Sequence, residues 1–204
     1  AGGCLVSLLA TFLHFYEVNG PYNLIFLASA EEEISGQNGV SAVLPQLGNI
    51  DFAIVGEPTL MQMAVAEKGL MVLDCTVKGK AGHAARNEGK NAIYEALPII
   101  QWFKTYQFEQ ESEWLGPIKM SVTQVNAGTQ HNVVPDACQL VVDVRTTDVM
   151  SNKEVLSLIQ ESVNCEVKAR STRLNPSSIS TDHPIVKAGK AMGMSLYGSP
   201  TLSD

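Results

Sequence analysis

Three adjacent carboxylates, Glu31, Glu32 and Glu33, directly follow an apolar segment over residues 22–30 that predicts a buried strand. Neighbouring like charges repel by roughly 1 kcal/mol or more at ~4 Å, so the surroundings must offset this repulsion. One explanation is the start of the next helix near Asn38, where acidic groups are favoured by ~0.3 to 1 kcal/mol. The other is that one carboxylate binds a divalent metal while its neighbour acts as general base on a metal-bound water.

A fourth carboxylate, Glu57, lies near the end of a second apolar segment, over residues 51–59, which also predicts a short buried strand. Parallel strands end at a common edge of their sheet, where ligands bind. Glu57 is therefore expected close to the three glutamates, as a second metal ligand. A glutamate before a proline is also usual in a solvated turn, so this motif alone is weak.

The elements that must position these carboxylates alternate between helix and strand over the first third of the chain. Such alternation predicts a mainly parallel sheet with helices on both faces. The opening helix is expected to pack through one stripe, formed by Leu5, Leu8, Leu9, Phe12, Leu13 and Tyr16. A second helix is expected over residues 38–48, with four side chains inward: Val40, Val43, Leu44 and Leu47.

A different pattern begins at about Lys68, where apolar residues alternate along strands that have one solvated face. The order strand, helix, strand, strand, helix, strand predicts a ferredoxin-like split unit. Its strands are expected over residues 69–79, 118–125, 138–146 and 163–171, with Met71, Leu73, Cys75 and Val77 on one face of the first. Its first helix, over residues 91–106, carries Ile93, Ala96, Leu97 and Ile100. Its second helix opens with a capping box of Ser151 and Glu154, and a further helix near residues 184–194 rejoins the first sheet.

The composition narrows the class of protein. The chain has 204 residues, 45% of them apolar, and a net charge of -7, which indicates a soluble globular protein and argues against a nucleic-acid surface. No apolar run reaches the ~18 residues that a membrane span needs. Four dispersed cysteines form no metal-binding or disulfide pattern, so reduced thiols and a cytoplasmic location are expected. Neither end looks like a natural terminus, and we expect an internal piece of a longer protein.

Five segments, taken together and in order, resemble the signatures of one known family. They are "LASAEEEISGQNG", "IVGEPT", "VKGKAGHAARNEGKNAI", "GTQHNVVPDACQLVVDVR" and "GSPTLSD". The family is that of the co-catalytic zinc metallopeptidases, which includes carboxypeptidase G, aminoacylases, acetylornithine deacetylase and succinyl-diaminopimelate desuccinylase. The resemblance implies an α/β fold: a catalytic zinc-hydrolase domain, here partial, over residues 1–67 and 174–204, with an inserted ferredoxin-like α+β lid or dimerisation domain over residues 68–173.

The resemblance also implies a role for each acidic residue. Glu32 matches the general base, Glu33 and Glu57 match ligands of the two zinc ions, and Glu31 fills a position where an acidic residue commonly precedes the pair. The complete enzyme would hold two Zn²⁺ per subunit, with Co²⁺ as a substitute. The family's other ligands, a His-x-Asp pair, a bridging Asp and a C-terminal His, have no match in this sequence, and two carboxylates are too few for a tight zinc site.

Three residues of the lid match the family's substrate-handling positions. His83 matches a histidine that reaches across a dimer interface to polarise the scissile carbonyl in the partner's active site, which implies a homodimer through the lid. Asn132 and Arg145 match positions that hold the substrate carboxylate. An ion pair with Asp143 is the alternative for Arg145, and a plain loop position is the alternative for His83.

The implied activity is removal of an acyl group from the α-nitrogen of an amino acid, a small-molecule substrate. The segments "AEEEISGQNG" and "SPTLSD" are most similar to those of acetylornithine deacetylases. These enzymes act on acetylornithine or succinylornithine in arginine biosynthesis. Succinyl-diaminopimelate desuccinylase and dipeptidases of the same family are alternatives. A further alternative is that the chain as given is a catalytically inert dimerisation fragment. Neither nucleic acid nor membrane is expected as a partner.

Overall fold

The computed structural model describes residues 2–31, 36 and 38–202. It divides the chain into two compact units: unit 1 is Ala1–Gln62 with Ser203–Asp204, and unit 2 is Met63–Leu202. This division differs from the predicted domain boundaries at residues 67 and 174, which stay a prediction. Each unit is described below by itself.

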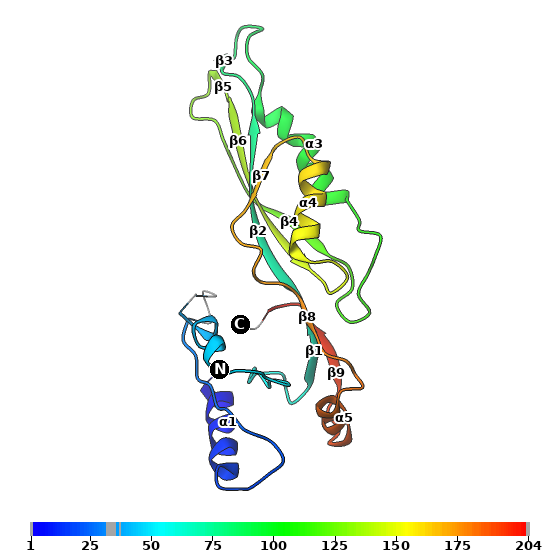
Figure 1. The fold of residues 1–204 in the computed structure, drawn as a ribbon. Helices are drawn as coiled ribbons and strands as arrows, with labels where there is room; N and C mark the ends of the chain where they lie inside the picture. The colour runs from blue at the N-terminus through cyan, green and yellow to red at the C-terminus, as the bar shows by residue number, and fades with distance from the viewer. Residues whose placement is uncertain (1, 32–35, 37, 203–204) are drawn as a thin grey trace. The chain divides into compact units, whose positions relative to one another are not determined.

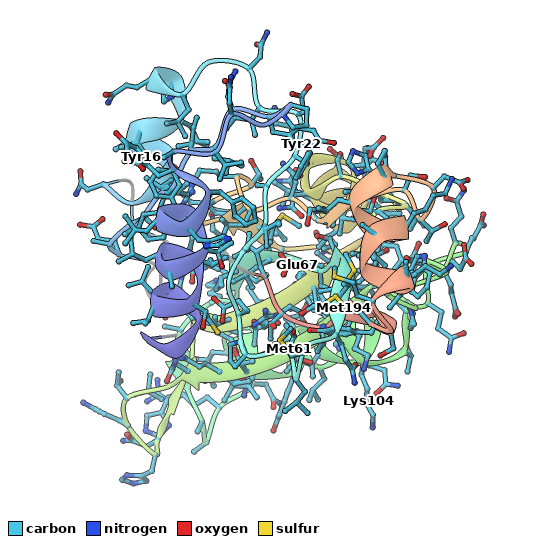
Figure 2. The ribbon with its side chains drawn as sticks, turned by 90° about the horizontal axis from the view of Figure 1, so that it is seen from below. Tyr16, Tyr22, Met61, Glu67, Lys104 and Met194 are labelled. Carbon is cyan, nitrogen blue, oxygen red and sulfur yellow. The ribbon has the colours of Figure 1, made fainter. Side chains whose placement is uncertain are left out.

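The described residues of unit 1 form the helical elements α1 (Gly2–Phe15), α2 (Val40–Val43) and η2 (Leu44–Gln46). The predicted opening helix is confirmed as α1. Its predicted apolar stripe is only partly covered, because no residue of α1 is fully buried and Leu13 and Tyr16 are exposed. Figure 2 shows Tyr16 at the end of α1 and Tyr22 on the segment that follows it.

The two strands predicted in unit 1 are not formed. Residues 22–30 and 51–59 form no strand, and side chains such as Ile25 and Val55 are exposed. A strand exists only through ladder hydrogen bonds to a neighbour, and neither segment has such a neighbour among the described residues. The predicted parallel sheet is therefore wrong for unit 1, where the segments instead pack through side chains, as in the pair Phe12 and Phe26 with ring centroids 5.9 Å apart.

The helix predicted over residues 38–48 is present but broken. It forms one α-helical turn, α2, and continues as the 3₁₀ turn η2. Pro45 explains the break, because proline has no backbone N–H and its ring clashes with the preceding turn of an α-helix. Leu44, the first residue of η2, is exposed, so the prediction that it faces inward is wrong.

Unit 2 is built on a four-stranded antiparallel sheet in the order β4-β6-β2-β7. Its strands are β2 (Gly69–Lys78), β4 (Lys119–Ala127), β6 (Ala137–Thr146) and β7 (Glu166–Ala169), and its helices are α3 (Ala92–Thr105) and α4 (Asn152–Ser162). This is the predicted order of strands and helices. Both helices cover one face (Figure 1), where the alternation in β2 buries Met71, Leu73, Cys75 and Val77 as predicted. The other face of the sheet, which we call the open face, carries no helix of this unit.

Local capping sets the start of both helices. The Asn91 side chain accepts a hydrogen bond from the Ile93 N–H at 2.9 Å, which begins α3. The predicted capping box of Ser151 and Glu154 is confirmed at the start of α4, with both of its hydrogen bonds formed. The core residues of α3 are Ala92, Ala96, Ile99 and Phe103. Of the predicted apolar set, Ala96 is therefore buried, whereas Ile93 and Leu97 lie on the exposed side of the helix.

A small sheet and a small ribbon occupy opposite ends of unit 2 (Figure 1). The small sheet has the order β8-β1-β9, with β1 (Met63–Glu67) parallel to β9 (Leu196–Ser199) and antiparallel to β8 (Ser177–Ser178). The predicted late helix follows β8 as α5 (Pro184–Ala191). The ribbon consists of β3 (Gly82–His83) and β5 (Val133–Val134). We call the end with the ribbon the tip and the end with the small sheet the base.

Candidate functional site

The carboxylate of Glu31 is held by local hydrogen bonds. Its Oε2 accepts from the Asn38 N–H at 3.1 Å and its Oε1 from the Asn38 Nδ2 at 3.2 Å. Its carbonyl accepts from the Gly36 N–H at 3.0 Å, and a side chain at Gly36 would lie 2.6 Å from the Glu31 Cβ, so the turn requires glycine there. For Glu31, the hydrogen-bonding groups that precede α2 offset the negative charge, which is the first of the two explanations.

Glu57 is half-buried in a turn that lies against α1. Its N–H donates to the Val55 carbonyl at 3.2 Å, and its carbonyl accepts from the Thr59 N–H at 2.9 Å. The preceding Gly56 lets the backbone approach α1, since a Cβ there would lie 2.6 Å from the Leu8 Cδ1. The backbone around Glu57 is therefore fixed by the helix that packs beside it.

The described residues do not make a metal site by themselves. Glu32 and Glu33 lie outside the described residues, so Glu57 is the one predicted zinc ligand that can be placed. Within the described ranges, no three His, Cys, Asp or Glu side chains gather into a group that could hold a metal ion. Zinc sites use three or four protein ligands, and the donors that can be placed fall short of that number.

The tip of unit 2 brings together two of the predicted substrate residues. His83 in β3 pairs with Val133 in β5, and the Ala84 N–H donates to the Asn132 carbonyl at 2.9 Å. His83 and Asn132 therefore sit side by side, although they are far apart in the sequence. Gly89, with a φ of 85°, closes the loop after β3 in a backbone conformation that favours glycine.

His83 is exposed and its ring is oriented by the backbone. Its Nδ1 accepts a hydrogen bond from the Ala85 N–H at 3.2 Å. A neutral imidazole that accepts at Nδ1 carries its proton on Nε2. The Nε2–H is thus the ring group that can act as a hydrogen-bond donor.

Arg145 lies near the base, at the other end of β6. It lies eight positions along β6 from Ala137, about 26 Å of strand at ~3.3 Å per residue, and β6 begins below the tip, so Arg145 is at the opposite end of the strand from His83 and Asn132. Its guanidinium makes a two-pronged ion pair with Asp143, with N···O distances of 2.9 and 3.1 Å. The alternative predicted for Arg145, an ion pair within the domain, is therefore present. In one chain the three substrate residues cannot meet around a small ligand.

Residues that the sequence did not single out surround Arg145 on the open face. Arg145 pairs with Leu70 of β2 on one side and with Lys119 of β4 on the other. Lys68 lies just before β2, is only 5% exposed and donates from Nζ to the Pro117 carbonyl at 2.8 Å. Its pKa is lowered by burial and by the nearby charges of Lys119 and Arg145. The sequence gives no clear signal for its burial, because Lys68 stands between Glu67 and Gly69 at a junction between two strands.

One edge of the large sheet carries an apolar patch near the tip. We call it the α3–β4 patch: the exposed side chains of Ile93, Tyr94, Leu97 and Val125. The strand β4 is the free edge beside it and has no charged residue after Lys119. The opposite edge, β7, has only four residues, two of which are the charged Glu166 and Lys168. Short, charged edges resist pairing and long, uncharged edges invite it.

The Peptidase dimerisation domain of the M20 family matches residues 65–170, just over half of the chain. The chain therefore belongs to the M20 peptidase family, a family of typically metal-dependent hydrolases. Within the part of the chain that the structure describes, no helix is long and apolar enough to cross a bilayer. The cysteines Cys4, Cys75, Cys138 and Cys165 are free thiols. The cytoplasmic location stays a prediction.

Relatives extend the likeness beyond the matched domain. The succinyl-diaminopimelate desuccinylase of Orientia tsutsugamushi (strain Ikeda) is 24% identical over 174 residues, which are 79% of this chain and 45% of that protein. The chain thus spans about half the length of this curated relative. A crystal structure of a tripeptidase from Staphylococcus aureus subsp. aureus Mu50 matches 98% of this chain and 56% of that chain, with 20% identity and a TM-score of 0.71. The aminopeptidase PepT from Bacillus cereus ATCC 10987 matches 70% and 41%, with 19% identity and a TM-score of 0.53. At these identities the two structures establish the mixed α/β fold.

Proposed function

We propose that the whole protein is a metal-dependent amidohydrolase that removes an acyl group from the α-nitrogen of an amino acid. The observation that carries the proposal is the placement of His83 beside Asn132 at the tip of an M20 dimerisation domain, with the His83 Nδ1 occupied by the Ala85 N–H so that Nε2 is the donor atom of the ring. Membership of a family of hydrolases and the alignment with a desuccinylase support the reaction class.

Two substrate classes are candidates for this activity. The sequence of the segments "AEEEISGQNG" and "SPTLSD" favours acetylornithine or succinylornithine as the substrate, as in arginine biosynthesis. The likeness to a succinyl-diaminopimelate desuccinylase favours an N-succinyl amino acid. Both substrates present an amide next to a carboxylate, so the same residues can serve either.

The acidic residues of unit 1 supply the proton transfer and part of the metal site in this proposal. Glu33 and Glu57 contribute carboxylates to a zinc pair that residues outside this sequence complete. When bound, such a pair polarises the amide carbonyl and acidifies a water molecule. Glu32 accepts a proton from the attacking water and returns it to the leaving amine.

His83 and Asn132 act in the partner's active site in this proposal. The His83 Nε2–H donates to the oxyanion that forms from the amide carbonyl. The homodimer forms through the lid, where β4 of one protomer lies beside β4 of its partner and the two α3–β4 patches cover each other. The uncharged edge of β4 and the exposed patch next to it support this interface.

The test of the activity is a parallel assay of the full-length protein with acetylornithine, succinylornithine and succinyl-diaminopimelate. Turnover of an ornithine derivative supports the first substrate class, and turnover of succinyl-diaminopimelate alone supports the second. Loss of activity with a chelator and its return with Zn²⁺ or Co²⁺ is expected in either case. Absence of turnover with all three substrates would overturn the proposal.

The 204-residue chain by itself is an inert dimerisation module in the alternative proposal, which the shortage of metal ligands among the described residues favours. Zinc titration calorimetry on this chain tests that alternative. Weak or absent binding is expected, because two carboxylates are too few for a tight site. Micromolar or tighter binding by the chain alone would contradict it.

A further inference from the structure

Two of the four thiols lie together in unit 2. The register pairs Cys75 of β2 with Val167 of β7, and Cys165 stands two positions before Val167, directly ahead of that strand. Residues two apart along an extended segment point to the same face of a sheet. Both thiols accordingly face the core: Cys75 is one of its buried residues, and Cys165 packs against it as a partly buried residue. The Cys75 thiol donates a hydrogen bond to the Cys165 sulfur.

The two thiols differ in exposure and in the way they hold their protons. Cys75 is 1% exposed, whereas Cys165 is partly exposed. Because Cys165 accepts the hydrogen bond, its pKa is lowered, and the pKa of Cys75 is raised by the same hydrogen bond and by burial. Oxidants react with the thiolate form of cysteine, and they must be able to reach it. Cys165 is therefore the reactive thiol of the pair, and Cys75 is a second thiol next to it.

A cavity gives small molecules access to this part of unit 2. Its volume is ≈290 Å³, whereas a water molecule takes about 30 Å³. Its lining includes Val163 and Asn164, which directly precede Cys165 in the sequence. The lining also includes Val77, which lies two residues after Cys75 on the same face of β2. A molecule as small as hydrogen peroxide therefore has room beside the thiol pair.

The backbone at Cys165 is placed so that it can adapt to a bond between the two sulfurs. Disulfide-bonded cysteines usually have Cα atoms ~4.4 to 6.8 Å apart, and diagonal neighbours on paired strands are ~7 to 8 Å apart, so closure needs a movement of about 1 Å. Cys165 lies in the bend between α4 and β7, before Glu166, the first residue of β7 that pairs with β2. This movement can therefore take place without shifting the register of the sheet.

We propose that Cys165 is an oxidation site for hydrogen peroxide and that Cys75 converts the oxidised product into a disulfide. In the first step, the Cys165 thiolate attacks one peroxide oxygen, the O–O bond breaks, hydroxide leaves, and Cys165 becomes a sulfenic acid. In the second step, the Cys75 sulfur attacks the Cys165 sulfur, and the hydroxyl group leaves as water with the proton of the Cys75 thiol. Two electrons thus pass from the two thiols to the peroxide.

The bond formed in this way is reversible and separate from the proposed hydrolysis. A dithiol reductant returns both cysteines to thiols by exchange. Disulfides of proteins in reducing compartments are usually of this transient, redox-sensing kind. Neither Cys75 nor Cys165 belongs to the residues that act on the acyl amino acid in the proposed function.

Tryptic mapping of the full-length protein tests the site, because each cysteine of unit 2 falls on its own peptide. Cys75 lies in residues 69–78, Cys165 in residues 154–168 and Cys138 in residues 120–145. The folded protein is treated with hydrogen peroxide, the remaining thiols are blocked with N-ethylmaleimide, and mass spectrometry identifies the peptides. A disulfide between peptides 69–78 and 154–168 is expected, and dithiothreitol is expected to remove it.

Three variants assign the roles within the pair. With Cys75→Ala, oxidation is expected to stop at the sulfenic acid, which dimedone labels on peptide 154–168. With Cys165→Ser, the buried Cys75 is expected to stay reduced. Cys138→Ala is the matched control, because Cys138 is 0% exposed on the neighbouring strand β6 and burial raises its pKa. This control is expected to form the same disulfide as the wild type.

The wild-type protein alone can overturn the proposal, whether or not a variant folds. Cys138 of the wild type is expected to oxidise at least about tenfold more slowly than Cys165. Equal oxidation of Cys138 and Cys165 would refute a specific site, and so would a peroxide-treated wild type that lacks the disulfide. Dimedone labelling of Cys75 in the Cys165→Ser variant would contradict the assignment of Cys165 as the reactive thiol.

Discussion

The separation between the tip and Arg145 predicts that active sites are shared between protomers. Arg145 lies about 26 Å of strand from Ala137, where β6 begins below the tip that carries His83, so the two residues are at opposite ends of the lid. Replacing His83 with alanine in the full-length enzyme removes one oxyanion donor and is expected to lower kcat by about 100-fold or more. This loss alone does not tell which protomer the histidine serves.

Heterodimers with two substitutions answer that question. In the split heterodimer, one protomer carries His83→Ala and the other Glu32→Gln. If the tip serves the partner's site, the protomer with intact Glu32 receives an intact His83, and about half of the wild-type kcat per dimer is expected. If the tip serves its own site, both sites are defective and the activity is close to zero.

The matched control places both substitutions on one protomer and pairs it with a wild-type protomer. Sharing between protomers now predicts almost no activity, because the wild-type Glu32 faces a His83→Ala tip. Sites confined to one protomer predict about half of the wild-type activity instead. Co-expression with two affinity tags isolates each heterodimer, and steady-state kinetics measures kcat. Activity in the control and none in the split heterodimer would refute the reasoning.

Three further predictions concern unit 2. Asn152→Ala is expected to lower the free energy of unfolding by about 2 to 4 kcal/mol in urea titrations, because the buried Asn152 side chain bonds one hydroxyl and two backbone carbonyls. A loss below 1 kcal/mol would show that water replaces these bonds. Ser151→Ala is expected to cost about 1 kcal/mol through the capping box with Glu154, whereas Ser151→Gly costs only a few tenths. The Cys75 thiol donates a hydrogen bond to the Cys165 sulfur, which lowers the pKa of Cys165 and raises the pKa of Cys75. Iodoacetamide is therefore expected to modify Cys165 of the folded protein at a lower pH than free cysteine and to spare Cys75, with mass spectrometry as the readout.

The sequence predicted the large sheet of unit 2 well because its signals are local. Strict alternation along β2 marks the buried face, and it agrees with the four core residues of that strand. The capping box at Ser151 is likewise a signal contained within four residues. Helix phase was harder to predict, since Ile93 and Leu97 are apolar but lie outside the core. An apolar residue on a surface used for association gives the same signal as a core residue.

Local patterns could not predict that the two apolar segments of unit 1 form no strands. The apolar runs at residues 22–30 and 51–59 indicate burial, but a strand also needs a neighbour with which to pair. No local pattern states which segment that neighbour is. The described part of the chain provides none for either run.

The candidate site was only partly predictable for a related reason. The nearness of His83 and Asn132 comes from the pairing of β3 with β5, which brings distant segments together. Lys68 was missed because lysine is usually a surface residue. Its 5% exposure and its hydrogen bond to the Pro117 carbonyl are apparent only from the structure.

The difference between the two edges of the large sheet limits how many copies can join. A sheet extended through β4 would have eight strands, four from each protomer, and would end in β7 on both sides. Because β7 is short and charged, neither outer strand offers a template for a third copy. In the proposed dimer, the exposed edge of β4 would be covered and the two outer edges would resist further pairing, so open-ended, fibre-like growth is not expected.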